Sequence, residues 1–167
     1  GVNSINDVAV LTGSVYDPSA DSWSPMPNQS VDGFTGEDFF WINLFITWAG
    51  SEMVLGGVED GFENVLVTYS FDPQANEWSV IDRVNDVPFL ELDEQEPIWT
   101  GSELIVGGVS NEFESETNVD AWEGYSFNPI SRSWSKISSV NAPIYGAGNL
   151  NVDENTQTFW TGSKMIV

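Results

Sequence analysis

Residues Trp99-Thr-Gly-Ser-Glu-Leu-Ile-Val-Gly-Gly108 form a phrase that occurs three times in this chain of 167 residues. Earlier it reads Trp48-Ala-Gly-Ser-Glu-Met-Val-Leu-Gly-Gly57, and later it begins again as Trp160-Thr-Gly-Ser-Lys-Met-Ile-Val167. Its first tryptophan recurs after 51 residues, from position 48 to 99, and then after 61, from 99 to 160. The phrase therefore marks an internal repeat, and the rest of the chain is interpreted around it.

A second phrase alternates with the first. It reads Tyr16-Asp-Pro-Ser-Ala-Asp-Ser-Trp23, then Phe71-Asp-Pro-Gln-Ala-Asn-Glu-Trp78, then Phe127-Asn-Pro-Ile-Ser-Arg-Ser-Trp134. Proline presets φ for a tight turn, and the Asp or Asn before it can accept hydrogen bonds from backbone amides beyond it. Because the proline and the tryptophan keep one spacing, each phrase predicts a hairpin of fixed register.

Short apolar runs separated by turn residues predict strands throughout, and no stretch has a helical period. A repeat near fifty residues with several strands per repeat favours a β-propeller over a helical solenoid. If the four strands of a unit are called a to d, the chain supplies an incomplete propeller of about three blades. We expect strands c and d at 8–27, full units at 45–81 and 97–137, and strands a and b at 158–167. Long connections are expected at 1–8, 28–46, 58–64, 82–96, 109–123 and 138–157.

Composition supports a folded, acidic domain. Apolar residues make up 41% of the chain, and 26 acidic residues against 4 basic ones give a net charge of −22. Nucleic acid and anionic membrane surfaces are disfavoured as partners, because both require a basic surface. The chain has no cysteine and no histidine, which excludes disulfides and thiolate catalysis and removes the commonest metal ligand and general base. It also has no apolar run long enough to span a membrane.

The acidic residues are concentrated in the expected connections, which hold 20 of the 26. In a four-stranded antiparallel blade the b–c and d–a connections lie at one end, so the charge is predicted to form an acidic long-loop face. Loops on a rigid scaffold are common binding sites. The candidate partner-binding residues, which include two tryptophans outside the repeat, are Glu59, Asp60, Asp93, Glu94, Glu112, Glu114, Glu116, Asp120, Trp41 and Trp122.

Three interpretations of the acidic face stay open. It could dock a cationic partner, bind Ca²⁺ through several oxygens, or simply be a solvated surface suited to a salty environment. None of the clusters has the spacing of an EF-hand loop, so no cofactor is expected apart from the open Ca²⁺ alternative. The six tryptophans at repeat positions are interpreted as packing between blades.

The two phrases resemble bacterial Kelch repeats, and the resemblance covers nearly the whole chain. It implies one four-stranded blade per repeat, with Gly-Gly in the second strand and Trp near the fourth. The chain departs from the pattern at Ala49, where Thr is usual, and it lacks the Arg and the His-Thr pair that often precede the first phrase. Phe45-Ile46-Thr47, Glu96-Pro97-Ile98 and Thr158-Phe159 occupy that region. Apolar packing between blades is therefore expected there in place of a polar contact.

Some Kelch propellers are enzymes, such as galactose oxidase and sialic acid mutarotases. The copper chemistry of the oxidase needs His and a Cys-linked Tyr, which this chain does not have. The expected function is therefore a non-catalytic binding scaffold for a protein or carbohydrate, extracellular or periplasmic in a bacterium. The first alternative is a fragment of a carbohydrate-active propeller enzyme whose catalytic residues lie partly in other blades, and the second is a purely structural role in a cell-surface assembly. Because three blades cannot close a ring, we expect the chain to be an excerpt of a longer protein, with self-association as the alternative.

Overall fold

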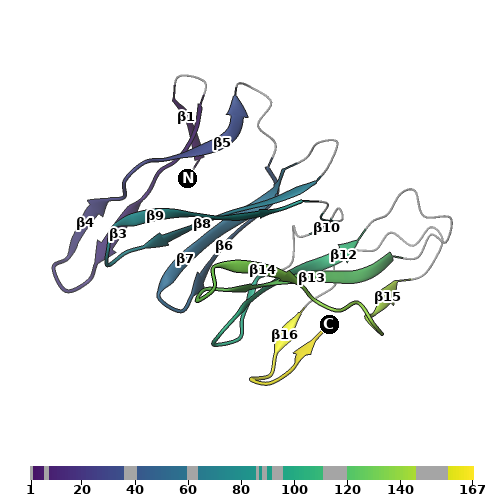
Figure 1. The fold of residues 1–167 in the computed structure, drawn as a ribbon. Coiled ribbons are helices and arrows are strands. Elements are labelled where there is room, and N and C mark those ends of the chain that lie inside the picture. The colour runs from purple at the N-terminus through teal and green to yellow at the C-terminus, as the bar shows by residue number, and fades with distance from the viewer. Residues whose placement is uncertain are drawn as a thin grey trace.

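A computed structural model describes residues 2–5, 8–35, 41–59, 64–85, 87, 90–91, 96–110, 120–145 and 158–167. Every regular element in these ranges is a β-strand, and every pairing between strands is antiparallel. The all-β prediction is confirmed. Figure 1 shows the sheets following one another in chain order from the N-terminus to the C-terminus.

Two small sheets, one of three strands and one of two, follow each other along one long hairpin, and together they are called the first sheet. Its elements are β1 (Val2–Ile5), β2 (Val8–Leu11), β3 (Ser14–Asp17), β4 (Ser22–Pro25) and β5 (Gln29–Thr35). β2 pairs with β1 and β5, while β3 pairs with β4. The Met26 amide donates to the Gly13 carbonyl at 2.9 Å and joins the two halves of the hairpin.

The second sheet is four-stranded, with its strands in chain order. They are β6 (Trp41–Ala49), β7 (Glu52–Glu59), β8 (Val65–Asp72) and β9 (Glu77–Val84). Short turns join β6 to β7 and β8 to β9. Both turns therefore lie at one end of the sheet, and the connection from β7 to β8 lies at the other.

The third sheet has the same strand order as the second, but its first and last strands are each interrupted and form two short strands. It contains β10 (Leu90–Glu91), β11 (Ile98–Trp99), β12 (Leu104–Ser110), β13 (Asp120–Asn128), β14 (Ser133–Lys136) and β15 (Ile144–Tyr145). β10 and β11 both pair with β12, and β14 and β15 both pair with β13. β16 (Phe159–Trp160) and β17 (Met165–Ile166) then form a two-stranded terminal hairpin.

The register is the same in equivalent units. Met53 lies opposite Phe71 in the second sheet, and Leu104, at the matching position, lies opposite Phe127 in the third. The aromatic residue that opens each second phrase lies opposite the tryptophan that closes it, with ring centroids 5.0 to 5.3 Å apart in all three hairpins. The constant Pro–Trp spacing in the sequence follows from this shared register.

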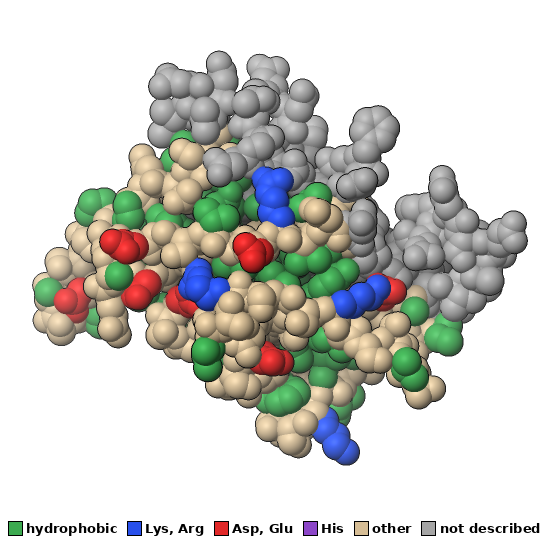
Figure 2. All heavy atoms as spheres, viewed as in Figure 1, with side chains coloured by type: hydrophobic (Ala, Val, Ile, Leu, Met, Phe, Trp, Pro, Cys, Tyr) green, Lys and Arg blue, Asp and Glu red, His purple; other side chains and the backbone are tan. Residues whose placement is uncertain are grey.

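Two apolar cores hold neighbouring sheets together. Leu11 and Val31 of the first sheet pack with Leu55, Val67 and Tyr69 of the second. The second and third sheets share a larger core, whose buried members include Val54, Leu66, Ile81, Leu104 and Phe127. The second sheet is therefore covered on both of its faces. On the side drawn in Figure 2 the lysine and arginine side chains are scattered rather than gathered into a patch.

The strands extend further than the sequence predicted. Residues 1–8 were expected to form a loop, but β1 lies within them and pairs with β2. The expected connection at 28–46 is largely strand, since β5 and β6 occupy 29–35 and 41–49. Strands can contain polar residues because backbone hydrogen bonds hold paired strands together and one face of an antiparallel sheet can be exposed to solvent. Apolar runs alone therefore underestimate strand length.

Each predicted Pro-containing turn is fixed by the residue before the proline. The Asp72 carboxylate accepts hydrogen bonds from the amides of Gln74 at 2.8 Å and Ala75 at 3.2 Å, and Asp17 and Asn128 do the same in their turns. The sixth residue of each phrase has a positive φ: 46° at Asp21, 55° at Asn76 and 55° at Arg132. Asp and Asn tolerate this left-handed conformation better than most residues, whereas arginine gains nothing from it. Arg132 therefore occupies its position for another reason.

Candidate functional site

Most of the predicted acidic-face residues lie outside the described residues: Asp60, Asp93, Glu94, Glu112, Glu114 and Glu116. Glu59 is the last residue of β7, and Asp120 is the first residue of β13. Both therefore lie at the end of their sheet opposite the short turns, which is where the topology argument expected them. Trp41 begins β6 and lies opposite Glu59, within a strand rather than a loop.

Trp122 is the one predicted partner-binding residue whose side chain is described, and it is buried. Its exposed fraction is 3%, and it lies within β13 rather than beside a loop. The indole ring covers Gly107 and Gly124, which are paired across β12 and β13. A Cβ atom added at either glycine would come within 2.4 Å of the ring. Trp122 thus packs the sheet, and its ring offers no face to a partner in this conformation.

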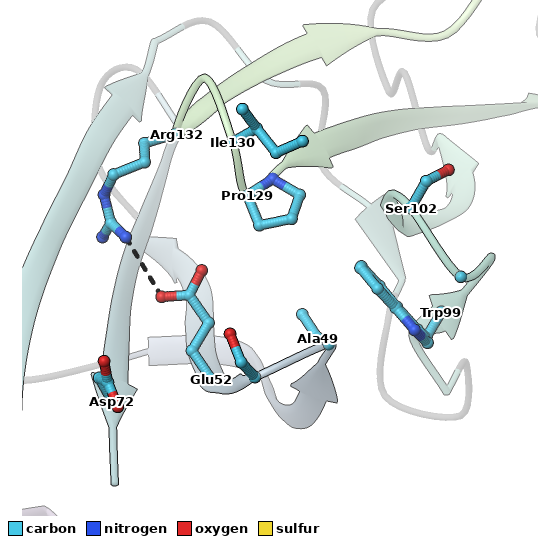
Figure 3. Close-up of a pocket in the computed structure, with 11 residues that line it drawn as sticks. Ala49, Glu52, Asp72, Trp99, Ser102, Pro129, Ile130 and Arg132 are labelled. Atoms are coloured by element: carbon cyan, nitrogen blue, oxygen red, sulfur yellow. Dashed lines mark hydrogen bonds and ion pairs between the residues drawn. The ribbon is translucent and has the colours of Figure 1, made fainter. Parts of the chain in front are cut away.

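The other end of the sheets, which carries the short turns, contains a hollow of about 470 Å³ between the second and third sheets. Figure 3 shows Glu52 and Arg132 on one side of it and Trp99 and Ser102 on the other. The lining residues come from the β6–β7, β8–β9, β11–β12 and β13–β14 turns and the strand ends beside them: Ala49, Gly50, Ser51, Glu52, Asp72, Trp99, Gly101, Ser102, Pro129, Ile130 and Arg132. We refer to this hollow as the turn-end hollow.

Arg132 bridges the two sheets at one wall of the turn-end hollow. Its Nη1 lies 3.2 Å from Glu52 Oε2, and its Nη2 donates to the Ser70 hydroxyl at 2.8 Å (Figure 3 shows the first contact). Ser70 is fully buried, and the Glu52 side chain is 12% exposed. The guanidinium group thus satisfies two polar groups of the second sheet that burial would otherwise leave without water.

Trp134 makes a second polar contact across the same seam. Its indole Nε1 donates to the Thr68 hydroxyl at 3.2 Å, and Thr68 is fully buried. Its ring meets Phe45 edge-on, with centroids 6.5 Å apart. The apolar packing expected at Phe45 is therefore present. Arg132 and Trp134 add polar contacts between the sheets, and these come from the second phrase rather than from the region before the first phrase.

The turn-end hollow has limited chemistry of its own. Its charged groups are Glu52, Asp72 and Arg132; Arg132 is engaged by its neighbours, and Asp72 holds its own turn. Within the described ranges no group of three or more His, Cys, Asp or Glu side chains could hold a metal ion. The hollow is best described as a seam between sheets, fixed by one ion pair and flanked by Trp99.

In the β3–β4 hairpin, hydrogen bonds within the turn shift the pKa values of two side chains. The Ser19 hydroxyl and then the Ser19 and Ala20 amides donate to Asp17, and these hydrogen bonds lower the pKa of its carboxyl group. The Tyr16 hydroxyl donates to Asp21 at 2.6 Å, which raises the pKa of the tyrosine. Both groups are exposed, so these shifts concern the turn rather than a catalytic centre.

Sequence reasoning missed the turn-end hollow. It placed function on the long connections, because acidic residues are dense there, and it treated the short turns as purely structural. One signal was available: Arg132 stands where the other two repeats have Asp21 and Asn76, residues suited to a left-handed turn. A basic side chain in an acidic chain, at a position that disfavours it, indicates a specific contact.

Comparisons with known proteins do not assign the chain to a family. A scan against models of protein families finds none that matches, and a search of characterised proteins finds no similar sequence. Among the described residues there is no helix with the length and apolar content to cross a bilayer.

Proposed function

We propose that this chain is part of a Kelch-type β-propeller that acts as a non-catalytic binding scaffold and engages a cationic partner through its acidic long-loop face. The blade assignment is supported by the succession of antiparallel sheets, each packed on the next through an apolar core. It is also supported by the shared register of equivalent strands, because blades of one propeller repeat a single plan. Kelch membership rests on the two recurring phrases.

The observation that carries the proposal is topological. Glu59 and Asp120 mark the points where β7 and β12–β13 lead into their b–c connections, at the end of the sheets opposite the short turns. The acidic residues of these two connections adjoin these points in the sequence: Asp60 and Glu63 follow Glu59, and Glu112, Glu114 and Glu116 precede Asp120. A rigid array that gathers several acidic loops at one end creates a negative field that attracts and orients a positively charged partner.

The test is binding of a lysine-rich peptide, measured by calorimetry at low and at physiological salt. Neutralising three residues of one acidic loop should weaken binding and flatten its salt dependence: Glu112→Gln, Glu114→Gln and Glu116→Gln. The matched control neutralises three acidic residues of the short turns, Asp21→Asn, Glu77→Gln and Glu103→Gln, and should leave the affinity nearly unchanged. An equal loss of affinity in both triple variants would mean that binding depends on the net charge of the chain and not on the acidic long-loop face. That result would overturn the proposal.

A parallel salt titration distinguishes Ca²⁺ binding from binding of a cationic protein. If micromolar CaCl₂ raises the melting temperature and NaCl at the same ionic strength does not, the acidic loops bind the metal. If both salts stabilise the chain alike, screening of self-repulsion explains the effect, and only the peptide measurement bears on the proposed function.

A further inference from the structure

The turn-end hollow has the size of a small-molecule site. Its lining residues all lie between positions 49 and 132, so both of its walls belong to the second and third sheets. Its volume of about 470 Å³ falls within the range of about 300–1,000 Å³ that is usual for ligand pockets. Such pockets combine apolar or aromatic walls with a few polar groups, and the lining of this hollow provides both.

One carboxylate oxygen of Glu52 has no partner among the described residues. Its Oε2 atom accepts from Arg132 at 3.2 Å, whereas no described residue bonds to Oε1. Figure 3 shows this second oxygen pointing away from Arg132. The Glu52 side chain is only 12% exposed, and an acceptor so shielded from water is costly when it is left unpaired. Because Glu52 lines the hollow, a donor that enters the hollow can satisfy it.

Three further polar side chains line the same space. Asp72 uses Oδ1 to hold its own turn, which leaves Oδ2 as an acceptor. Ser51 and Ser102 are exposed turn residues whose hydroxyls can both donate and accept. The Ser102 hydroxyl has only a 3.5 Å contact within the chain, to the hydroxyl of Thr100. The hollow therefore offers hydrogen-bonding groups on more than one of its walls.

Trp99 supplies an aromatic wall opposite Glu52 (Figure 3). The ring packs on the β6–β7 turn, where a Cβ atom at Gly50 would come within 3.2 Å of it, and on the apolar core, so its position is fixed. Pro129 and Ile130 bring further apolar surface from the β13–β14 turn, and Ile130 is 93% exposed. A ligand with an apolar face would cover these side chains.

We propose that the turn-end hollow binds a neutral carbohydrate. The C–H face of a sugar ring stacks on Trp99, and a sugar hydroxyl donates to Glu52 Oε1. The two carboxylates of the hollow and the net charge of −22 disfavour an anionic ligand. Arg132, directly beside Glu52, disfavours a cation at the same oxygen. An uncharged molecule rich in hydroxyl groups avoids both penalties. This inference depends neither on the acidic long-loop face nor on membership of the Kelch family.

The first experiment follows the amide and indole N–H signals in the NMR spectrum of the full 167-residue chain as a neutral sugar is added. The sugars are glucose, galactose, mannose, N-acetylglucosamine, maltose, cellobiose and lactose. At least one should move the indole signal of Trp99 and the amide signals of the turns beside it, with an affinity that NaCl does not change.

Three results of this titration would overturn the inference. In the first, none of the sugars moves the Trp99 signal. In the second, the sugar moves only signals of Trp23 or Trp48, which are exposed outside the hollow. In the third, glucosamine, which is cationic, binds more tightly than N-acetylglucosamine, and the site then selects positive charge.

The second experiment measures the dissociation constant of the bound sugar in variants of the lining. Trp99→Leu removes the stacking surface and should raise the constant about tenfold. Ser102→Ala removes one hydrogen-bonding group and should raise it about threefold. The matched control, Trp23→Leu, removes a tryptophan that is 71% exposed outside the hollow and should leave the constant unchanged.

Ile130→Ala keeps the test decisive if Trp99→Leu does not fold. The Ile130 side chain is 93% exposed, so its loss should not alter the circular dichroism of the chain, and the sugar should bind more weakly. Unchanged sugar affinity in both Ser102→Ala and Ile130→Ala would overturn the inference. Binding of the lysine-rich peptide should be the same in all of these variants, so the hollow and the acidic long-loop face are tested separately.

Discussion

Arg132 and Glu52 are 80 residues apart in the sequence, yet their side chains meet at 3.2 Å across the seam between the second and third sheets. Arg132 reaches this contact from a left-handed turn position, and Glu52 lies nearly buried at the start of β7. The pair therefore joins two sheets that the chain connects only through a long segment. Its strength can be measured separately from the apolar core beneath it.

Arg132→Ala should lower the free energy of unfolding by about 1–3 kcal/mol, because Glu52 and Ser70 would lose a partner inside the seam. Alanine keeps a Cβ atom at φ 55°, so the backbone strain is unchanged. Urea denaturation measures the effect. Lys164→Ala removes the same charge from an exposed turn and should change the stability by no more than about 0.5 kcal/mol. Equal stability of the two variants would show that the ion pair does not hold the sheets.

Trp134→Phe keeps an aromatic ring at the seam but removes the donor to the Thr68 hydroxyl. Because Thr68 is fully buried, its hydroxyl would be left without this donor, and we expect a loss of about 1–2 kcal/mol beyond that of the smaller ring. Thr68→Val removes the acceptor. In a double-mutant cycle the two changes together should cost less than their sum. Strict additivity would show that the hydrogen bond contributes nothing to stability.

Replacing Trp122 by a smaller residue should rescue an alanine substitution at Gly124 better than one at Gly107. A Cβ atom at Gly124 would meet the Trp122 ring at 2.4 Å, whereas the Val106 carbonyl oxygen would be 3.0 Å away. At Gly107 the Glu123 carbonyl oxygen is only 2.6 Å away. Each alanine variant alone should cost about 2 kcal/mol or more.

Adding Trp122→Leu should recover part of the stability of Gly124→Ala and little of that of Gly107→Ala, because backbone cannot withdraw as a side chain can. Thermal melting of the two single and two double variants, referred to Trp122→Leu alone, checks this. Equal rescue at both positions would mean that the ring, rather than the backbone, limits both sites.

Asp17 gives the first hairpin a predictable response to acid. Its pKa is lowered in the folded chain, chiefly by the Ser19 hydroxyl, so the carboxylate form is favoured by folding. Its contribution to stability is therefore present above the unfolded pKa and is lost as the pH falls through the folded value. An NMR titration should place the Asp17 midpoint below that of an unstructured aspartate, and Ser19→Ala should move it back upward.

Asp17→Asn serves as the control for that titration. Asn128 already occupies the same turn position, where its side-chain oxygen accepts the amides of Ile130 and Ser131. The Asp17→Asn hairpin should therefore keep its turn and lose the acid-dependent step. A variant that still loses the hairpin over the same pH range would assign the response to another group.

The hairpins of the second phrase could be predicted from the sequence, because their causes are local. The Asp or Asn before each proline holds the turn, and the fixed distance to the tryptophan sets the register. Strand ends were less predictable. β1 and β5 contain polar residues that read as loop, and their pairing depends on a neighbouring strand rather than on their own composition.

Contacts between sheets could not be predicted, because they depend on how the sheets pack. Nothing near Arg132 in the sequence points to Glu52, and Trp122 appeared to lie in a loop because β13 begins with polar residues that precede any apolar run. The candidate acidic site was derived from charge density and topology. The topology places Glu59 and Asp120 at one end of the sheets, and the other acidic residues of the candidate set remain a prediction.

The second sheet is the only one in the described part of the chain that contributes to both apolar cores. In an array where each layer touches only the next, the middle layer cannot open until an outer one has left. Backbone amides of β7 and β8 should therefore exchange with deuterium more slowly than those of β4 or β16. Loss of order should begin at the two ends and travel inward, so that a single transition temperature would describe this chain poorly.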